Sequence, residues 1–229
     1  MSGFDLILFD CDGVLVDSEI IAAQVESKLL KEAGFEITAE DMCIRFAGLD
    51  WKDILLEIEK ESDIPLSASL IDKSETLLDR ALMQRMKIIE GVKFALSKIT
   101  EQSCICSNSS SKRLDMMLTK VGLKPYFEPH IYSAKDLGPG RSKPKPDIYL
   151  HGAKVFNVDP SRCLVVEDSV HGVHAARAAG MRVIGFTGGS HTYPTHADRL
   201  TDAGAETVLS RMVELPQMVE ALKNWTELA

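Results

Sequence analysis

The sequence of 229 residues has too few basic side chains and too few cysteines for several classes of protein. Lysine and arginine total 26 against 34 aspartates and glutamates, so the formal net charge is −8, which is the wrong sign for binding a nucleic-acid backbone. The five cysteines are an odd, scattered set, which excludes a dense disulfide framework. We expect these cysteines to be reduced and buried.

Long apolar segments are also missing. The longest apolar runs, such as residues 6–9, are far shorter than the roughly 20 residues that a membrane-spanning helix needs. No basic segment precedes an apolar stretch, as it would in a secretory leader. We therefore expect a cytoplasmic protein without a membrane or nucleic-acid partner. The hydrophobic residues, at 45 %, suffice for one large domain or for a medium-sized domain with a small insert.

Short apolar runs bounded by turn or acidic residues recur along the chain and predict buried strands. They occupy residues 6–9, 104–106, 130–133, 163–166, 183–186 and 207–209. Helical patterns lie between them, and in one of these Val92, Ala95, Leu96 and Ile99 are spaced at i, i+3, i+4 and i+7. Strands that alternate with helices favour right-handed crossovers, which place helices on both faces of a parallel sheet. The predicted fold class is therefore α/β with three layers.

The alternation is interrupted between about residues 17 and 88, where the pattern predicts helices and no strand. The four expected helices span residues 19–33, 39–46, 51–61 and 67–86. Ile21, Val25 and Leu29 form an apolar stripe on the first of them, so the insert can bury a modest core of its own. We expect residues 17–88 to be a mobile helical cap domain, and residues 1–16 together with 89–229 to be the α/β core domain.

Two acidic pairs follow predicted strands. Asp10 and Asp12 come directly after the first strand, and Glu167 and Asp168 come at the end of the fourth. Open α/β sheets bind their ligands at this carboxyl edge, and if the two strands are neighbours the four carboxylates converge. Such convergence is costly unless some carboxylates are protonated or a hard cation lies among them, and ligation by oxygen alone favours Mg²⁺ over zinc. The alternative for either pair alone is that aspartate merely caps the following helix.

Two further segments offer groups that bind phosphate. Ser107 and Asn108 follow the second strand and precede a helix, so their hydroxyl and backbone N–H groups form an anion site at a helix N-terminus. The alternative is that they only cap this helix. Lys143 lies in a loop that Pro144 and Pro146 stiffen, which would hold the lysine rigidly. Taken alone, Lys143 has the alternative role of a solvated surface charge.

In this order, the motifs resemble those of the haloacid dehalogenase-like hydrolase superfamily. The four segments that carry the resemblance are residues 10–19, the strand that ends in Ser107-Asn108, the string Lys143-Pro144-x-Pro146-Asp147, and residues 166–169. The resemblance covers nearly the whole chain. It implies a Rossmann-like core with a helical cap inserted after the first motif, as in the β-phosphoglucomutase-like branch. Within that branch, the string Asp10-Cys11-Asp12-Gly13 is similar to that of the 6-phosphogluconate phosphatase-type sugar-phosphate phosphatases.

The resemblance implies a role for each of these residues. Asp10 would be the nucleophile that accepts the phosphoryl group, and Asp12 would be the general acid and base. Mg²⁺ would be held by Asp10, the backbone carbonyl of Asp12 and Asp168, with Glu167 close by or acting through water. The groups that would hold the phosphate oxygens are Ser107, Asn108 and Lys143. The activity expected is therefore Mg²⁺-dependent hydrolysis of a small phosphorylated metabolite, a sugar or sugar-acid phosphate, through an aspartyl phosphate.

Two alternatives to a phosphatase stay open. Phosphosugar mutases of the same branch carry a histidine early in the first cap helix and a basic residue before the cap-loop glycine. This chain instead has Ile-Ile-Ala at residues 20–22 and Ala47 before Gly48, which argues against a mutase. A receiver-type phospho-switch, which is not an enzyme, also combines an acidic Mg²⁺ pocket with a lysine. Such a domain is much shorter and lacks the helical insert.

The loop between the second and third cap helices supplies candidates for substrate specificity, namely Arg45, Gly48, Trp51 and Lys52. The resemblance places this loop against the substrate, where Arg45 or Lys52 would meet a carboxylate or a second phosphate. The alternative is that both are solvated charges and that Trp51 belongs to the core of the cap. We expect the protein to be a monomer or a weak homodimer.

Overall fold

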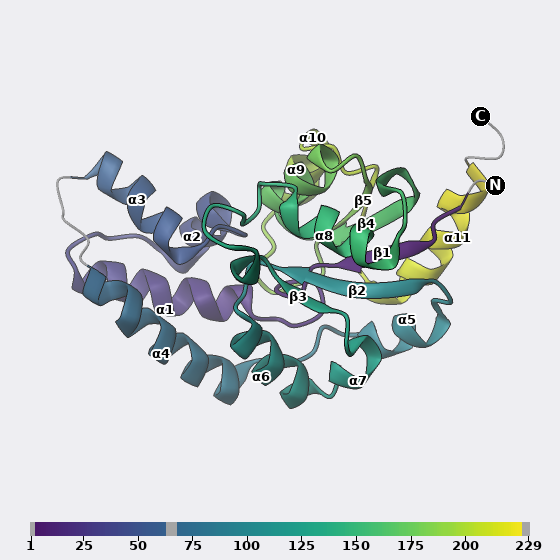
Figure 1. Ribbon diagram of the computed structural model, residues 1–229. Coiled ribbons are helices and arrows are strands. Elements are labelled where there is room, and N and C mark those ends of the chain that lie inside the picture. The colour runs from purple at the N-terminus through teal and green to yellow at the C-terminus, as the bar shows by residue number, and fades with distance from the viewer. Residues whose placement is uncertain (1–2, 63–67, 226–229) are drawn as a thin grey trace.

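The computed structural model describes residues 3–62 and 68–225, and it contains one parallel sheet of six strands in the order β3-β2-β1-β4-β5-β6 (Figure 1). The strands are β1 (Leu6–Phe9), β2 (Gln102–Ser107), β3 (Ile131–Ser133), β4 (Cys163–Glu167), β5 (Arg182–Phe186) and β6 (Thr207–Leu209). Each apolar run that predicts a strand corresponds to one of these. The prediction of a parallel α/β sheet is confirmed.

Helices cover both faces of the sheet because the strands are apolar on both sides. One face carries α5 (Val92–Lys98), α6 (Ser111–Val121), α7 (Lys124–Phe127) and α11 (Leu215–Trp225). The other carries α8 (Asp147–Phe156), α9 (Val170–Ala178) and α10 (His196–Asp202). Short 3₁₀ turns lie at Ala134–Leu137, Pro160–Arg162 and Met212–Glu214. Along β1, Ile7 and Phe9 pack on the first side and Leu6 and Leu8 on the second, so the domain has three layers.

Four helices lie between β1 and α5 in the chain and extend beyond one end of the sheet (Figure 1). They are α1 (Glu19–Glu32), α2 (Ala39–Phe46), α3 (Trp51–Glu61) and α4 (Ala68–Arg85), and residue 67 of the fourth expected helix lies outside the described residues. A separate apolar cluster joins α1, α2 and α3 and includes Leu30, Phe46 and Ile58. Two residues of the expected stripe, Ile21 and Val25, pack instead with α4 in the apolar cluster on the face of the sheet that carries α5 and α6. This stripe therefore attaches α1 to the core layer.

The register of the two central strands determines which acidic residues meet. Phe9 of β1 pairs with Val166 of β4, so Asp10 and Glu167 leave the sheet side by side. The backbone N–H of Asp10 also donates to the carbonyl of Val166 at 3.0 Å. The condition that the first and fourth strands are neighbours is thus met.

The cysteines are all free and buried, as expected. Cys104 and Cys106 point to the same side of β2, with their sulfur atoms 4.0 Å apart, and both belong to the apolar cluster around α8. Among the described residues, no helix combines the length and the hydrophobicity that a membrane span requires.

Candidate active site

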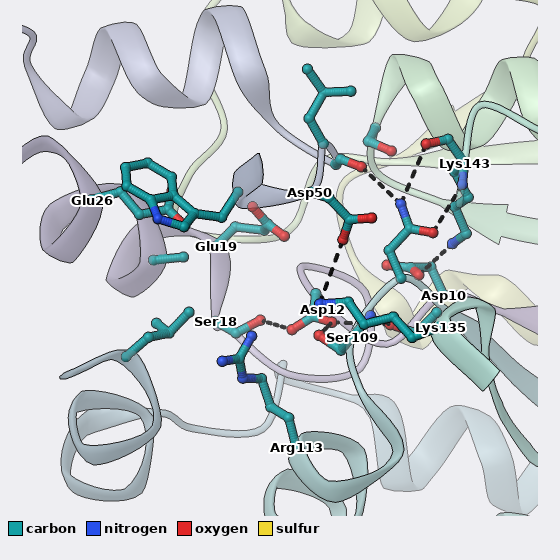
Figure 2. A pocket seen from close by; sticks show the side chains of 18 of the residues that line it. Asp10, Asp12, Ser18, Glu19, Glu26, Asp50, Ser109, Arg113, Lys135 and Lys143 are labelled. Carbon is teal, nitrogen blue, oxygen red and sulfur yellow. Dashed lines mark hydrogen bonds and ion pairs between the residues drawn. The ribbon is translucent and has the colours of Figure 1, made fainter. Parts of the chain in front are cut away.

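A cavity of about 290 Å³ lies where the carboxyl ends of the central strands face α1, α3, α4 and the loop after α2 (Figure 2). It brings together residues from distant parts of the chain. The expected residues that line it are Asp10, Asp12, Ser107, Asn108, Lys143, Glu167, Asp168, Gly48, Trp51 and Lys52. Arg45 does not line this cavity. Its guanidinium pairs with Glu61 at 2.6 Å and lies over the ring of Phe46.

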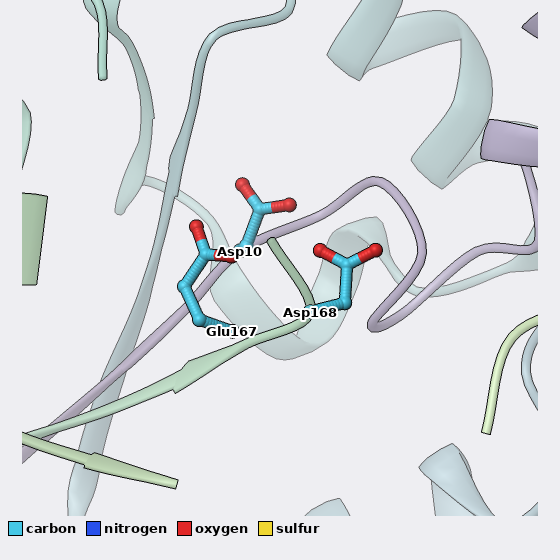
Figure 3. A group of neighbouring side chains, drawn as sticks. All are labelled: Asp10, Glu167 and Asp168. Carbon is cyan, nitrogen blue, oxygen red and sulfur yellow. The ribbon is translucent and has the colours of Figure 1, made fainter. Parts of the chain in front are cut away.

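Three buried carboxyl groups converge at the floor of the cavity (Figure 3). Asp10, Glu167 and Asp168 each offer an oxygen within 4.8 Å of the others. Burial raises the pKa of Asp10 well above its usual range, and the neighbouring carboxylates of Glu167 and Asp168 raise it further, while Lys143 opposes the shift. Burial and Glu167 likewise raise the pKa of Asp168. Without a bound metal cation, the three carboxyl groups resist being ionised at the same time.

Lys143 is the buried cation at this floor. Its ammonium group donates hydrogen bonds to Asp10 and, at 2.8 Å, to Glu167. Burial alone would lower the pKa of Lys143, but the two carboxylates outweigh burial and raise it above the usual lysine value. The alternative of a solvated surface charge is therefore wrong, because only 3 % of this side chain is exposed. Pro144 follows in the stiffened loop, and α8 begins directly after Pro146.

Glu167 is fully enclosed by hydrogen-bond donors. One of its oxygens accepts from Lys143 and from the hydroxyl of Tyr149 at 2.9 Å. The other accepts from the backbone N–H and the hydroxyl of Ser169, at 2.9 and 3.0 Å. Although burial acts to raise its pKa, Lys143 and these donors lower it, so Glu167 remains a carboxylate. Both oxygens are engaged with protein groups, which makes Glu167 the anchor of Lys143.

Gly172 provides the space that Glu167 occupies. A Cβ atom at this position would lie 1.7 Å from Oε1 of Glu167. We expect Gly172→Ala to push this carboxylate out of place, to lower the free energy of unfolding by about 1–3 kcal/mol and to reduce turnover as well. Thermal unfolding and phosphate release measure the two effects. In the control Gly3→Ala, the added methyl group meets no atom within 4 Å and both quantities should stay unchanged.

Asp12 is held by hydroxyl groups from several segments. Its carboxylate accepts from Ser18 and Ser109, both at 2.8 Å, and from Ser107 at 3.2 Å. It does not belong to the three converging carboxyl groups. Gly13 follows with φ +72°, and a Cβ atom there would lie 1.8 Å from Asp168, so glycine permits the close approach of the two strand ends. The side chain of Asp12 is thereby directed into the cavity and kept apart from the acidic cluster.

Asn108 connects the lysine loop with the inserted helices. Its side-chain oxygen accepts from the backbone N–H of Lys143 at 2.9 Å, and its amide nitrogen donates to the carbonyl of Gly48 at 3.3 Å. Gly48 has φ +81°, and a Cβ atom there would lie 2.4 Å from the hydroxyl of Ser169. The loop after α2 therefore needs glycine where it touches the core. Trp51, which donates to the carbonyl of Leu70 at 3.4 Å, also contributes to the apolar cluster of the inserted helices.

Several residues near the site were not anticipated from the sequence. Glu19, Glu26 and Arg113 line the cavity. Behind the acidic cluster, His196 Nε2 donates to the backbone carbonyl of Asp168 at 2.7 Å, and His191 Nε2 lies 2.9 Å from Oδ2 of Asp168. Burial lowers the pKa of both histidines, that of His196 to about 4, so both are neutral at pH 7. No local pattern marks the two histidines, because His191 lies in the long loop after β5 and His196 begins α10, both far in the chain from Asp168.

The donor set fits a hard divalent cation. Oδ2 of Asp168 is buried and has no hydrogen-bond partner among the described residues, because His191 is not aligned to donate to it. A buried carboxylate oxygen without a partner is costly, and a cation among oxygen ligands removes that cost. Asp10 and the backbone carbonyl of Asp12 stand at the neighbouring strand end. The chemistry of this floor is thus suited to a hard divalent cation.

Comparisons with known proteins agree with this geometry. Residues 7–186 match the sequence profile described as haloacid dehalogenase-like hydrolase. The chain belongs to this family. A 6-phosphogluconate phosphatase of Escherichia coli K12 is 29 % identical over 228 residues, which are 98 % of each chain.

Two solved structures of this family are also similar. A haloacid dehalogenase-like protein of unknown function from Agrobacterium tumefaciens is 74 % identical, with a TM-score of 0.88 over 96 % of this chain and 99 % of the other. A family hydrolase from Deinococcus radiodurans, with bound phosphate and sodium, is 34 % identical, with a TM-score of 0.78 over 97 % of each chain. The expected resemblance and the expected fold are confirmed.

Proposed function

We propose that this family hydrolase is a phosphatase that cleaves the phosphomonoester of a small phosphorylated metabolite, a sugar or sugar-acid phosphate, with Mg²⁺ and an aspartyl-phosphate intermediate. One observation carries the proposal. Asp10 is a buried carboxylate at the floor of a cavity, bonded to Lys143 and beside the unpartnered oxygen of Asp168. The phosphatase name of the Escherichia coli relative and the phosphate in the Deinococcus structure support the same function.

In the first step, a carboxylate oxygen of Asp10 attacks phosphorus. A bond forms between this oxygen and phosphorus, the ester P–O bond breaks, and the leaving alkoxide takes a proton from Asp12. In the second step, water attacks the aspartyl phosphate, Asp12 takes back a proton, and inorganic phosphate leaves as Asp10 is regenerated. The hydroxyls of Ser18 and Ser109 orient Asp12 for both proton transfers, which leaves the Ser107 hydroxyl to turn toward the phosphate.

The positive charge around the phosphate comes from two sources. Lys143 stabilises the charge on the phosphoryl oxygens, and Ser107 with the backbone N–H of Asn108 holds them by hydrogen bonds. Asp10, the backbone carbonyl of Asp12 and Asp168 would hold Mg²⁺, which would supply the charge that lets an anionic nucleophile approach a dianionic ester. Glu167 keeps Lys143 in position from the other side.

Hydrolysis is favoured over the mutase alternative by the wall of the cavity. Residues 20–22 of α1, where mutases of this branch carry their histidine, are Ile-Ile-Ala, and of these Ala22 lines the cavity; Ala47 precedes Gly48. Neither alanine can act as an acid or a base, and neither can bind a second phosphate group. Water is then the acceptor that remains for the phosphoryl group.

The direct test is release of phosphate from p-nitrophenyl phosphate. We expect steady multiple turnovers with Mg²⁺ and none after EDTA, since removal of the cation leaves the carboxylates repelling the substrate. The readout is free p-nitrophenol with time. A single stoichiometric burst would indicate a phospho-switch and contradict the proposal, as would full activity in EDTA.

A further inference from the structure

The end of the cavity farthest from Asp10 carries polar groups that the reaction above does not use. Glu19, Ala22 and Glu26 share one face of α1 and line the cavity. Glu26 lies seven residues after Glu19, which places it about 10 Å farther along the helix. Figure 2 shows Glu26 across the pocket from Asp10 and Lys143. A substrate whose phosphate contacts Asp10 would extend its leaving group toward Glu26.

Glu26 is a buried acid whose carboxyl group is free to bind a polar ligand. Only 9 % of the residue is exposed, and it has no hydrogen-bond partner among the described residues. Burial raises the pKa of Glu26 to about 8, against the opposing effect of Arg113. At neutral pH the carboxyl group is then mostly protonated, so it can donate one hydrogen bond and accept others. A ligand hydroxyl satisfies such a group, because it also both donates and accepts.

Arg113 reaches the same cavity from α6. Its Nε donates to Asp79 of α4 at 2.7 Å, and 14 % of the arginine side chain is exposed. The aspartate already balances the charge of the guanidinium group. Arginine has five N–H donors, so further donors remain for oxygen atoms of a ligand. Together, Arg113 and Glu26 offer hydrogen-bond donors and acceptors to a ligand, and Asp79 balances the positive charge of the arginine.

Among the described residues, a carboxylate on the leaving group has no buried, unpaired cation to meet at this end. Arg113 is bonded to Asp79, and Lys135 is exposed and lies 3.8 Å from Asp50. Lys52 lines the cavity but is exposed. Glu19 and Glu26, two acids of α1, already line this wall. A further buried anion would lose hydration without a compensating partner.

We propose that Glu26 and Arg113 bind hydroxyl groups of an uncharged sugar or polyol phosphate, and that this end of the cavity discriminates against a terminal carboxylate. The proposal rests on the phosphatase function above and deepens it. Of the two substrate classes left open there, it selects the uncharged one.

The test uses two substrates that differ at one carbon. Glucitol 6-phosphate and 6-phosphogluconate have the same carbon chain and phosphate position, but C1 is a hydroxymethyl group in the first and a carboxylate in the second. We expect kcat/KM to be at least about tenfold higher for glucitol 6-phosphate, the value of one hydrogen bond gained or one charge rejected. p-Nitrophenyl phosphate, which has no hydroxyl chain, reports the chemical steps alone.

The outcomes separate the two proposals. If p-nitrophenyl phosphate is hydrolysed but 6-phosphogluconate equals or exceeds glucitol 6-phosphate, the hydroxyl site is refuted and the phosphatase function stands. Failure to hydrolyse glucitol 6-phosphate while p-nitrophenyl phosphate turns over refutes the site equally. If no phosphomonoester is hydrolysed, the phosphatase function itself fails.

Variants of Glu26 test the residue directly. Glu26→Leu should lower the ratio of kcat/KM for glucitol 6-phosphate to that for p-nitrophenyl phosphate by about tenfold, whereas Glu26→Gln, which still donates and accepts, should change it by about twofold or less. Glu32→Gln is the matched control, since Glu32 lies on the same helix, pairs with Lys73 and does not line the cavity. An equal loss on both substrates, with a lower thermal unfolding midpoint, would show a purely structural role and overturn the assignment.

Discussion

Asp10→Asn is expected to lower kcat for p-nitrophenyl phosphate by about four orders of magnitude or more. The neutral amide cannot form the acyl phosphate on which the proposed reaction depends. The same change should leave the fold at least as stable, because it removes one of three clustered, buried carboxyl groups while Lys143 keeps its bond to Glu167. Burial raises the pKa of Asp10, so its ionisation destabilises the fold as the pH rises, and asparagine does not ionise. Activity and stability therefore change independently.

The measurement pairs this variant with Asp12→Asn. In Asp12→Asn the nucleophile is intact but the general acid and base is missing, so an aspartyl phosphate should form slowly and persist. Mass spectrometry of the intact protein detects the added phosphoryl group, which should be absent from Asp10→Asn. Thermal unfolding in EDTA checks that both variants are folded. Normal turnover by Asp10→Asn would eliminate Asp10 as the nucleophile.

Lys143→Met is expected to weaken both the fold and the reaction. Methionine fills a similar volume but leaves Asp10 and Glu167 buried without their cation. Breaking a buried ion pair from one side costs about 3–5 kcal/mol of the free energy of unfolding. Loss of a fixed charge at the phosphoryl oxygens should also lower kcat by about two to three orders of magnitude.

The destabilisation should depend on pH and on Mg²⁺. Without Lys143, the pKa of the Asp10 carboxyl rises further, since the lysine is the group that opposes the effect of burial. These acids cost little when protonated, so the loss of stability should be smaller at acidic pH than at pH 8. Added Mg²⁺ should restore part of it by replacing the missing positive charge. These effects are measured by chemical unfolding in EDTA and in Mg²⁺.

Lys145→Met is the matched control for this experiment. Lys145 is exposed and belongs to the same loop, so its replacement should affect neither quantity. A Lys143→Met protein as stable in EDTA as the unaltered one would refute the electrostatic role assigned to Lys143.

The pattern of the sequence predicts much of the fold because its signals are local. The apolar run before Asp10 indicates a strand, and its acidic end marks the carboxyl edge of the sheet. The limits predicted for α2 and α3 agree with the structure, and the side chain of Thr38 caps α2 by accepting from the backbone N–H of Asp41. The motif around Lys143 combines a charged residue with two prolines within a few residues, and this local combination predicts a rigidly held lysine. None of these features depends on distant contacts.

The orientation of cap side chains was not predictable in the same way. The sequence offers Arg45 and Lys52 as equivalent cations on one loop. In the structure, Arg45 pairs with Glu61 of α3 and does not line the cavity of the acidic cluster, whereas Arg113 of α6 does. Arg113 follows the second strand of the core and Glu26 belongs to the first inserted helix, so no spacing in the chain relates them.

By itself, the sequence determined the alternation of strands and helices, the place of the insert and the acidic residues at the strand ends. These depend on hydrophobic periodicity and on turn-forming residues within short segments. Only the tertiary structure decided that Asp10 and Glu167 share Lys143 as their cation, that two histidines lie behind Asp168, and that Glu26 and Arg113 line the same cavity. Such contacts follow from strand order and helix packing, which bring together residues far apart in the chain.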